Sequence, residues 1–446
     1  AYTGHAYVDK NKNGVFDQSE KPLAGIKVSD GLNVVETAAD GSFTLPGHER
    51  ERFIFITTPS GYKTFNRHYH KIEKKQSGYD FGLIPYSGRI RKDGSHRYIH
   101  ITDTEIFNTE NHADWVNNVH DYARNEQAAF IIHTGDICYE KGLKAHIKLM
   151  NTENMDCPVF YCIGNHDLVK GKYGEELFES IYGPVYYSFD AGNVHYVVTP
   201  MPGGDHAPGY TSDDVCRWLK NDLAHIRPGT PVVVFNHDLL TYEDTFIFKS
   251  KNAGSINLNE YNLKAWVYGH WHINYMKKQG DVYSVCTSSL DKGGIDHSTT
   301  AFRVMHVDSK GDFTSELRYT YLDKNICIAS PAGVMASGVL PVAVNVYSSV
   351  SPVREVLYTC LADGKPVLKN KRLLQSTDWS WNGELPLSHK YVGKELTLRV
   401  TARFNNGEIA EAESNFICRT EKAVPLFSAD WDNLSGNAKH SAPVSA

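Results

Sequence analysis

The chain has 446 residues and a hydrophobic share of 41%, which allows several folded domains and argues against disorder. It has 46 lysines and arginines against 52 aspartates and glutamates, a net charge of −6, so its composition excludes a strongly basic surface for nucleic acid or acidic membranes. No apolar run is long enough to span a bilayer, so we expect no transmembrane segment.

The chain begins at Ala1 rather than Met and shows no signal peptide. We interpret this start as that of a mature or trimmed product. Together with the flanking β modules described below, it predicts a periplasmic or secreted, cell-surface location. Eight cysteines are scattered without a Cys-x-x-Cys pair, and we expect them to be buried free thiols. A disulfide such as Cys157–Cys162 would instead fit an oxidising compartment. Nothing in the sequence specifies an oligomeric state.

Residues 1–88 predict a small antiparallel β module of the sandwich type. Short alternating runs such as "IKVSDG", "ADGSFTLPG" and "FIFITTPSG" are separated by Asn-Gly, Asp-Gly and Ser-Gly turns. Helical periodicity is absent from this segment.

One loop of this module, "DKNKNGVFDQSE", has the spacing of a calcium-binding EF-hand loop. The oxygen ligands would come from Asp9, Asn11, Asn13, Asp17 and Glu20. The flanks predict strands rather than helices, so a calcium ion here would be structural. The alternative is a solvated Asx-rich turn that needs no ion.

Residues 95–322 predict an α/β domain. Apolar runs such as "RYIHITD", "AAFIIHTGD", "PVFYCIGNHD", "PVVVFNHD" and "LKAWVYGH" alternate with helical candidates such as "NHADWVNNVHDYARN". His100, His133 and His195 fall inside apolar runs, and we expect them to be structural. Ligands bind at the carboxyl ends of strands in such domains, so we expect the functional residues at the ends of these runs.

Residues 325–420 return to a β pattern and predict a C-terminal β-sandwich module, as in "LPVAVNVYSSV" and "ELTLRVTARFNNGE". Residues 421–446 are polar and without periodicity, which indicates a tail or a linker to a further module. The two flanking β modules suggest positioning on a polymer, a glycan or another domain.

The ends of the apolar runs in residues 95–322 carry ionisable side chains, which are suited to first-row divalent metals. A lone pair such as His270 and His272 in "GHWH" is more often a surface or core pair. Five such run ends in order are a stronger signal, because together they supply enough ligands for two metal ions. Two cations about 4 Å apart can clamp a phosphoryl oxygen. The residues at these ends are Asp103, Glu105, Asp136, Asn165, His166, Asp167, His237, His270 and His272.

Four of these stretches, "GDICY", "GNHD", "VVVFNH" and "GHWH", resemble the ordered motifs of the calcineurin-like metallophosphoesterases. The resemblance covers residues 95–322 and implies an α/β fold: a β-sandwich flanked by helices, with small all-β domains at both ends of the chain. It implies a phosphatase or phosphodiesterase that uses two divalent ions (Mn, Fe or Zn) and a bridging hydroxide. The substrate would be a phosphorylated small molecule or glycan.

The resemblance also implies a role for each residue at the strand ends. Asp136 would bridge the two metals, and Asp103 and His272 would hold the first. The second would be held by Asn165, His237 and His270.

Two further residues would serve the chemistry itself. His166 would help the leaving oxygen depart, as a general acid or electrostatic stabiliser. Asp167 would orient the structure around it; alternatively, Asp167 caps the helix that follows.

The first motif departs from the usual Asp-x-His, because the chain has "DTE". Glu105 is a competent oxygen ligand for the first metal. The alternative is Tyr139 of "GDICY", since purple acid phosphatases bind ferric iron through a tyrosine at that spacing. Tyr139 also stands where phosphoprotein phosphatases have aspartate, which argues against that class.

Two alternative functions follow from these departures. The first is a purple-acid-type phosphomonoesterase with Tyr139 on iron. The second is an inactive surface or carbohydrate-binding protein with a decayed phosphoesterase domain.

The sequence does not separate monoester from diester substrates, because the loops expected to crowd the metals (171–185, 201–212 and 239–260) carry no readable pattern. Asp205 and His206 lie in one of them, either in a plain edge loop or in contact with substrate.

Overall fold

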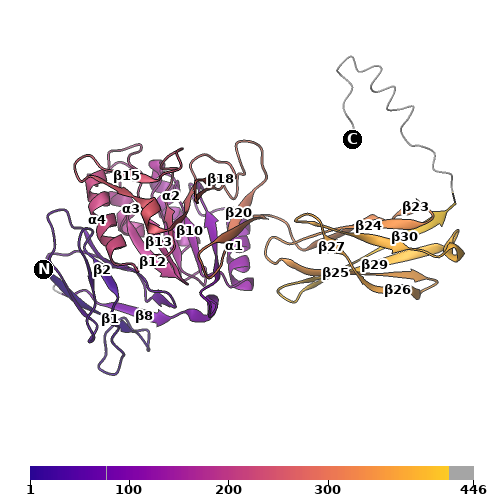
Figure 1. The fold of residues 1–446 in the computed structure, drawn as a ribbon, viewed down its shortest axis with the longest axis horizontal. Helices are drawn as coiled ribbons and strands as arrows, with labels where there is room; N and C mark the ends of the chain where they lie inside the picture. Colours follow the sequence, from indigo (N-terminus) through magenta and orange to yellow (C-terminus); the bar gives the residue numbers. More distant parts are fainter. Residues whose placement is uncertain (77, 421–446) are drawn as a thin grey trace, which may run out of the picture. The chain divides into compact units, whose positions relative to one another are not determined.

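The computed structural model describes residues 1–76 and 78–420 (Figure 1). The chain divides into two compact units, Ala1–Tyr321 and a second that begins at Leu322. The first unit combines the N-terminal β module with the α/β domain, and the second is all-β, which confirms the predicted fold class. The expected tail at 421–446 lies outside the described residues. None of the described helices has the length and apolar character needed to cross a bilayer.

Two four-stranded sheets, in the orders β4-β1-β8-β6 and β3-β2-β5-β7, form the N-terminal module. Their alternation matches the sequence pattern: Phe43 and Leu45 are buried while Thr44 between them is exposed. One pair departs from the expected antiparallel arrangement, because Ala6 of β1 faces Phe81 of β8 in parallel register. The strands are β1 Tyr2–Val8, β2 Lys27–Ser29, β3 Val34–Glu36, β4 Ser42–Leu45, β5 Phe53–Ile56, β6 Tyr62–Thr64, β7 Tyr69–Lys71 and β8 Phe81–Pro85.

The α/β domain contains two mixed sheets with the orders β11-β10-β9-β20-β21 and β12-β13-β14-β17-β19-β18. Strands β9, β10 and β11 are parallel in the first sheet, and β13, β14, β17 and β19 are parallel in the second. The first sheet consists of β9 His96–Ile101, β10 Phe130–His133, β11 Val159–Tyr161, β20 Ala301–Val307 and β21 Phe313–Tyr319. The second consists of β12 Tyr187–Ala191, β13 Val194–Val198, β14 Val232–Phe235, β17 Leu263–Tyr268, β18 Tyr275–Gln279 and β19 Val282–Cys286.

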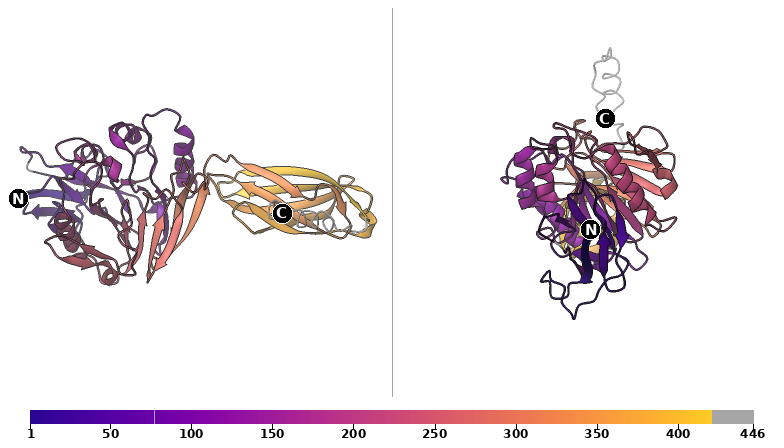
Figure 2. Two further views of the ribbon diagram at one scale, coloured as in Figure 1. Left: turned by 90° about the horizontal axis from the view of Figure 1, so that it is seen from above. Right: turned by 90° about the vertical axis from the view of Figure 1, so that its left-hand side faces the viewer.

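Helices cover the two sheets on both sides, as the right-hand view of Figure 2 shows. Trp115, Leu143 and Phe178 pack with Ile99 and Ile131 of the first sheet. The helices are α1 Ala113–Asn125, α2 Tyr139–Leu149, α3 Glu176–Tyr182 and α4 Ser212–Ala224. The remaining elements of this unit are the hairpin strands β15 Ile247–Lys249 and β16 Ser255–Asn257 and the 3₁₀ turns η1 Ser87–Arg89, η2 Asn165–Asp167 and η3 Leu258–Tyr261.

An aromatic layer joins the inner faces of the two sheets. Tyr98 and Phe130 of the first sheet stack with ring centroids 4.6 Å apart, and Tyr98 meets Phe235 of the second sheet edge-on at 5.7 Å. Tyr196 contacts both Phe130 and Phe235. Such rings bury large apolar areas and constrain the angle at which their neighbours pack, so this layer fixes how the two sheets face each other.

The N-terminal module shares this core rather than forming a separate one. Phe53 and Phe55 of β5 belong to the same buried cluster as the sheet residues, and Phe55 packs against Trp218 of α4 at 6.3 Å. A continuous apolar core explains why the module and the α/β domain form one compact unit.

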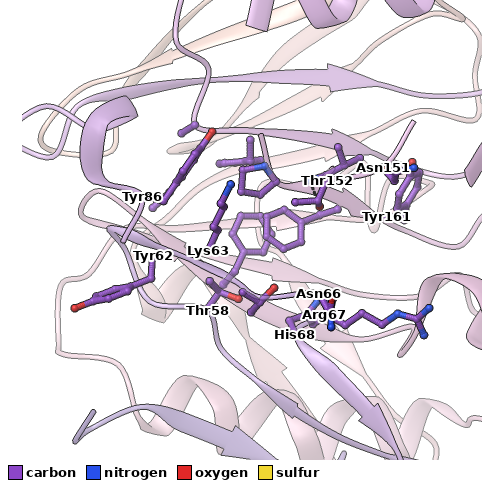
Figure 3. A pocket seen from close by; sticks show the side chains of 18 of the residues that line it. Thr58, Tyr62, Lys63, Asn66, Arg67, His68, Tyr86, Asn151, Thr152 and Tyr161 are labelled. Carbon is purple, nitrogen blue, oxygen red and sulfur yellow. Dashed lines mark hydrogen bonds between the residues drawn. The ribbon is translucent and has the colours of Figure 1, made fainter. Parts of the chain in front are cut away.

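A cavity of about 270 Å³ lies at the junction of the module with the starts of β10 and β11 (Figure 3). The candidate metal ligands follow the other ends of these strands. Its walls combine Lys63, which lies over the ring of Tyr86 at 5.1 Å, with His68 and Tyr161. The Nε2 atom of His68 is buried without a hydrogen-bond partner. Burial lowers the pKa of His68 to about 3, so this histidine is neutral.

The second unit is an all-β module with sheet orders β22-β24-β28-β27 and β23-β30-β29-β25-β26. Its core includes Val342, Val344, Val356, Leu398 and Val400. The elements are β22 Asn325–Ser330, β23 Gly333–Ala336, β24 Val339–Tyr347, β25 Val353–Ala362, β26 Lys365–Arg372, β27 Leu374–Gln375, β28 Ser380–Pro386, η4 His389–Tyr391, β29 Glu395–Phe404 and β30 Ile409–Arg419.

All eight cysteines are free, and all but Cys327 are buried. The Cys157–Cys162 disulfide considered above is therefore not formed.

The histidines inside the apolar runs are structural. His100 and His133 are buried and bond to the hydroxyls of Thr134 and Thr104 at 2.7 and 2.9 Å. His195 lies between two carboxylates, 2.6 Å from Asp190 and 2.6 Å from Asp222. Burial disfavours a charged His195, but the carboxylates of Asp222 and Asp190 outweigh it and raise its pKa to about 10.

This ion cluster predicts how stability depends on pH. The raised pKa of His195 contributes stability fully below about pH 6.5, and the contribution is lost as pH rises through about 10. His195→Gln should lower the free energy of unfolding by about 3 kcal/mol at pH 6, because it leaves two carboxylates unpaired. The difference from the unchanged protein should shrink toward pH 10, as measured by urea unfolding at fixed metal content. A difference that stays constant with pH would contradict a charged His195; His120→Gln, at a half-exposed position, is the control.

Candidate metal centre

The strand ends of both sheets converge on one edge of the α/β domain. Asp103 follows β9 and Asp136 follows β10, while Asn165 and His166 form η2 after β11. On the second sheet, His237 follows β14, and His270 and His272 follow β17. The carboxyl ends of parallel strands meet at the same sheet edge, which brings these turns together.

Several candidate ligands adopt left-handed backbone conformations, which side chains other than glycine rarely do. The φ angles are 51° at Asp103, 46° at Glu105, 56° at Asp136, 66° at His270 and 53° at His272. Each such residue costs about 1–3 kcal/mol, and this kind of strain concentrates at functional sites.

Two glycines permit the turns to approach closely. A Cβ on Gly164 would lie 2.3 Å from Oδ1 of Asp136, and one on Gly269 would lie 2.4 Å from Oδ2 of Asp103. Only glycine, which has no side chain, allows the backbone to come this close to the two carboxylates.

The first cluster consists of Asp103, Glu105 and His272, whose ligand atoms lie within 4.8 Å of one another. His272 Nε2 is 3.2 Å from Asp103 Oδ1 and 3.4 Å from Glu105 Oε1. The carboxylates of Asp103 and Glu105 raise the pKa of His272 to about 10. Lys292 Nζ holds the other oxygen of Glu105 at 3.1 Å.

The second cluster consists of Asp136, His237 and His270. His237 Nε2 is 3.1 Å from Asp136 Oδ2, and His270 Nδ1 is 3.2 Å from His237 Nε2. His237 Nδ1 bonds to the carbonyl oxygen of Thr134 at 2.7 Å, which orients the ring and turns Nε2 toward the site. Burial opposes a charged His237, but Asp136 and Asp103 raise its pKa to about 10.

The two clusters adjoin, because Asp103 Oδ1 lies 3.9 Å from His237 Nε2. Asn165 Oδ1 is buried without a hydrogen-bond partner, and Asp103 Oδ1 is buried with an ion-pair contact to His272 but no well-directed hydrogen bond. A buried polar atom without a partner is costly, and a bound cation would remove that cost. The mixed carboxylate, amide and imidazole donors fit a first-row divalent metal.

A third cluster of possible metal ligands consists of Glu105, Asp136 and Cys138. Cys138 was not among the ligands predicted from the sequence. Burial raises the pKa of the Cys138 thiol well above its usual range.

Asp167 connects the turns that carry these ligands. Its buried carboxylate accepts hydrogen bonds from the backbone N–H groups of Asp136, Cys138 and Gly164, at 2.9, 2.9 and 2.8 Å. Helix α3 begins at Glu176, so the alternative that Asp167 caps the following helix is wrong. Burial, together with the charge of Asp136, raises the pKa of Asp167 to about 7. Asp167 therefore acts by positioning the metal-binding turns.

His166 lies at the open side of the site. Its backbone N–H donates to Asp136 Oδ1 at 3.0 Å, and its ring atom Nδ1 is 2.8 Å from Asp205 Oδ2. Asp205, for which the sequence left a plain edge loop or a substrate contact open, is thus brought to His166. Burial opposes protonation of His166, but the hydrogen bond with Asp205 and the charge of Asp136 raise its pKa.

Tyr139 packs beside His166 with the ring centroids 5.3 Å apart, and on its other side it stacks with Phe107 at 6.4 Å. It remains 45% exposed. Its role as an iron ligand stays a prediction.

Two further residues contribute to the site, although neither belongs to a motif named above. Lys292 comes from the loop after β19, far from any motif, and only the fold brings it to Glu105. Asp238 accepts a hydrogen bond from Trp271 Nε1 at 3.0 Å and so holds the residue between His270 and His272. Its position directly after His237 was the one available hint.

The candidate calcium loop is closed by its own hydrogen bonds. Asp9 accepts from the N–H groups of Asn13 and Gly14 at 3.1 and 2.9 Å, and Asp17 accepts from the Asn11 amide at 2.7 Å. Among the described residues, the acidic, histidine and cysteine side chains that gather closely enough for a metal all lie in the α/β domain. Calcium binding here stays a prediction.

The family to which the chain belongs is shown by two matches along its sequence. Residues 96–274 match the family Calcineurin-like phosphoesterase, and residues 10–85 match the N terminal of Calcineurin-like phosphoesterase. The chain belongs to the calcineurin-like metallophosphoesterases.

Individual relatives are distant. Purple acid phosphatase 13 of Arabidopsis thaliana is 26% identical over 215 residues, which are 45% of this chain and 36% of the plant protein. The chain thus spans about a third of that relative's length.

Two solved structures can be compared. Vps29 of Entamoeba histolytica complexed with zinc shares 10% identity over 50% of this chain and 97% of that chain, with a TM-score of 0.25. A predicted phosphoesterase of Streptococcus pneumoniae shares 10% identity over 51% of this chain and 98% of that chain, with a TM-score of 0.24.

The position of Asp167 predicts the effect of removing its charge. Asp167→Asn retains the shape, but an amide cannot accept all three N–H groups and places its own NH₂ against one of them. We expect a loss of about 1–3 kcal/mol in stability and a metal affinity about 10–100-fold weaker. Thermal unfolding and metal content after dialysis would measure both, with Asp121→Asn on the surface as control. Unchanged metal retention would contradict a positioning role for Asp167.

Proposed function

We propose that the protein is a metal-dependent phosphoester hydrolase with two divalent cations at the converging strand ends. The observation that supports this most directly is the pair of adjoining donor clusters, beside which Asn165 Oδ1 is buried without a hydrogen-bond partner. Asp103, Glu105 and His272 would hold one cation; Asn165, His237 and His270 would hold the other; and Asp136 would lie between them. When bound, the cations supply positive charge to the phosphoryl oxygens and make water more acidic.

The residues of the chain supply the remaining steps. His166 lies at the open side, and its Nδ1 faces the carboxylate of Asp205. This contact orients the ring and leaves Nε2 to carry a proton to the leaving oxygen. The raised pKa of His166 favours the protonated form that a general acid requires.

Exposed rings beside the site favour a leaving group with a planar ring or a sugar face. Phe107 is 59% exposed, Tyr139 is 45% exposed, and their planes are 14° from parallel. A leaving group released next to His166 would lie against these rings. This supports a phosphorylated small molecule or glycan as substrate.

Two observations favour the purple-acid alternative: Tyr139 lies within ring contact of His166, and the chain matches a purple acid phosphatase. It would require iron and a visible absorption band that disappears in Tyr139→Phe. A colourless protein that turns over substrate with Mn or Zn would exclude it.

The periplasmic or secreted location also stays a prediction, which fractionation of the native bacterium would test.

The proposed function predicts metal-dependent turnover. A matched aryl phosphate monoester and diester would be offered to protein loaded with Mn, Zn or Fe. Asp136→Asn should lower kcat about 100-fold or more, because it removes the shared carboxylate; Asp121→Asn should not. The ratio of the two rates assigns the substrate class.

An inactive protein is the outcome that would overturn this proposal. If no metal supports turnover and fewer than one ion binds per chain, the decayed-domain alternative holds. Glu105 in place of histidine would then mark the decay.

A further inference from the structure

One loop of the α/β domain, residues 201–211, carries the partner of His166. It connects β13 to α4 and packs against the turn that carries Asn165 and His166. The backbone N–H of Asp205 donates to the carbonyl oxygen of Asn165 at 3.1 Å, next to the contact between Asp205 and His166. Gly204 allows this approach, because a Cβ there would lie 2.3 Å from the same carbonyl oxygen.

The far end of this loop is held through Gly209. Its N–H donates to the carboxylate of Glu175 at 2.8 Å, and its carbonyl oxygen accepts from Arg50 of the N-terminal module at 2.5 Å. A side chain at Gly209 would meet Glu175 and Tyr173 at 3.0 Å, so the loop lies directly against this surface.

A second arginine of the module neutralises the surface that receives the loop. Arg52 donates to Glu175 and Glu179, both at 2.7 Å, and its guanidinium lies over the ring of Tyr173 at 4.6 Å. Glu175 is fully buried. Without Arg52 it would be a buried carboxylate without a cationic partner, which is unfavourable enough to disturb its contact with Gly209.

The same module also reaches the helix that follows the loop. Arg50 Nε donates to Asp214 at 2.9 Å, in the first turn of α4. Both ends of the 201–211 loop are therefore held: one end contacts the turn that carries His166, and the other accepts a hydrogen bond from Arg50, 159 residues earlier in the chain.

We infer that the N-terminal module positions the catalytic acid: Arg50 and Arg52 act through Glu175, Gly209 and Asp205 to hold His166 where it serves the leaving oxygen. This inference rests on the proposed function. Neither arginine touches the substrate site, so both are positioning residues. The N-terminal module is thus a working part of the hydrolase and not only an adaptor to a glycan or polymer.

A positioning role for the acid makes a prediction about leaving groups. An alkyl phosphate ester needs a proton on its leaving oxygen, whereas a dinitrophenyl ester scarcely does. General acid catalysis contributes about 100–10,000-fold, so partial misplacement of His166 in Arg52→Gln should lower kcat on the alkyl ester about 10-fold. We expect KM to change little and kcat on the dinitrophenyl ester to fall far less. Arg52→Lys should recover part of the loss, because it keeps the charge beside Glu175.

Two measurements separate this role from general damage. Hydrogen exchange of the 201–211 segment should become faster in Arg52→Gln, while exchange in α1 stays unchanged. In a double-mutant cycle, Arg52→Gln should add little to Asp205→Asn, since both act through the same contact. Arg97→Gln is the matched control, because Arg97 forms a similar ion pair with Glu126 at 2.9 Å on β9, away from the loop.

Several outcomes would overturn the inference. These are an equal loss of kcat on both esters, an additive double mutant, or unchanged exchange of the loop. If Arg52→Gln does not fold, Arg50→Gln carries the same test, because it removes the other contact to Gly209. If the unchanged protein hydrolyses neither ester with any metal, the proposed function fails and this inference with it. Normal hydrolysis combined with insensitivity to both arginine variants would overturn the inference alone.

Discussion

The carboxylate of Asp167 is the interaction on which the candidate metal centre most depends. It accepts three backbone hydrogen bonds from two different turns, one after β10 and one after β11. These turns carry Asp136 and Asn165, and Asp136 has the uncommon left-handed backbone. Hydrogen bonds to a buried carboxylate are strong enough to offset a strained conformation of this kind. Asp167, which would not itself bind metal, therefore fixes the geometry of the turns that carry the candidate metal ligands.

The aromatic layer between the sheets decides where those turns meet. Tyr98, Phe130, Tyr196 and Phe235 pack across the interface, and the strands that contain them end at the same edge. Ligands carried on turns at the ends of packed strands inherit the rigidity of the core, although the turns themselves are irregular. The N-terminal module adds Phe53 and Phe55 to this core, which is why its arginines can hold a loop of the α/β domain in place.

The candidate metal centre is rich in negative charge, which favours the binding of protons or cations. Asp103, Glu105 and Asp136 concentrate three carboxylates in a small region, and the neighbouring histidines respond with raised pKa values, about 10 for both His237 and His272. Protons and metal ions compete for such groups, so a site that favours imidazolium in this way also favours divalent cations. Lys292 supplies a further charge beside Glu105, the residue that departs from the usual Asp-x-His motif.

The sequence by itself determined the strands, their buried faces and the order of the polar residues at their ends. These follow from local patterns: an alternation of two in β4, continuous apolar runs in β10 and β14, and motif spacing within "GNHD" and "GHWH". It also placed His100 and His133 in the core. Such features depend on neighbours in the chain, so composition and periodicity reveal them.

Only the tertiary structure decided which side chains contact one another around the candidate metal centre. The bond of Asp167 to Cys138, the contact of Asp205 with His166, the approach of Lys292 to Glu105 and the parallel pairing of β1 with β8 join residues far apart in the chain. Periodicity shows that a residue faces inward or outward, but not what it meets there. That choice depends on how the two sheets and the N-terminal module pack, because a hydrogen bond exists only when packing brings its donor and acceptor within about 3 Å.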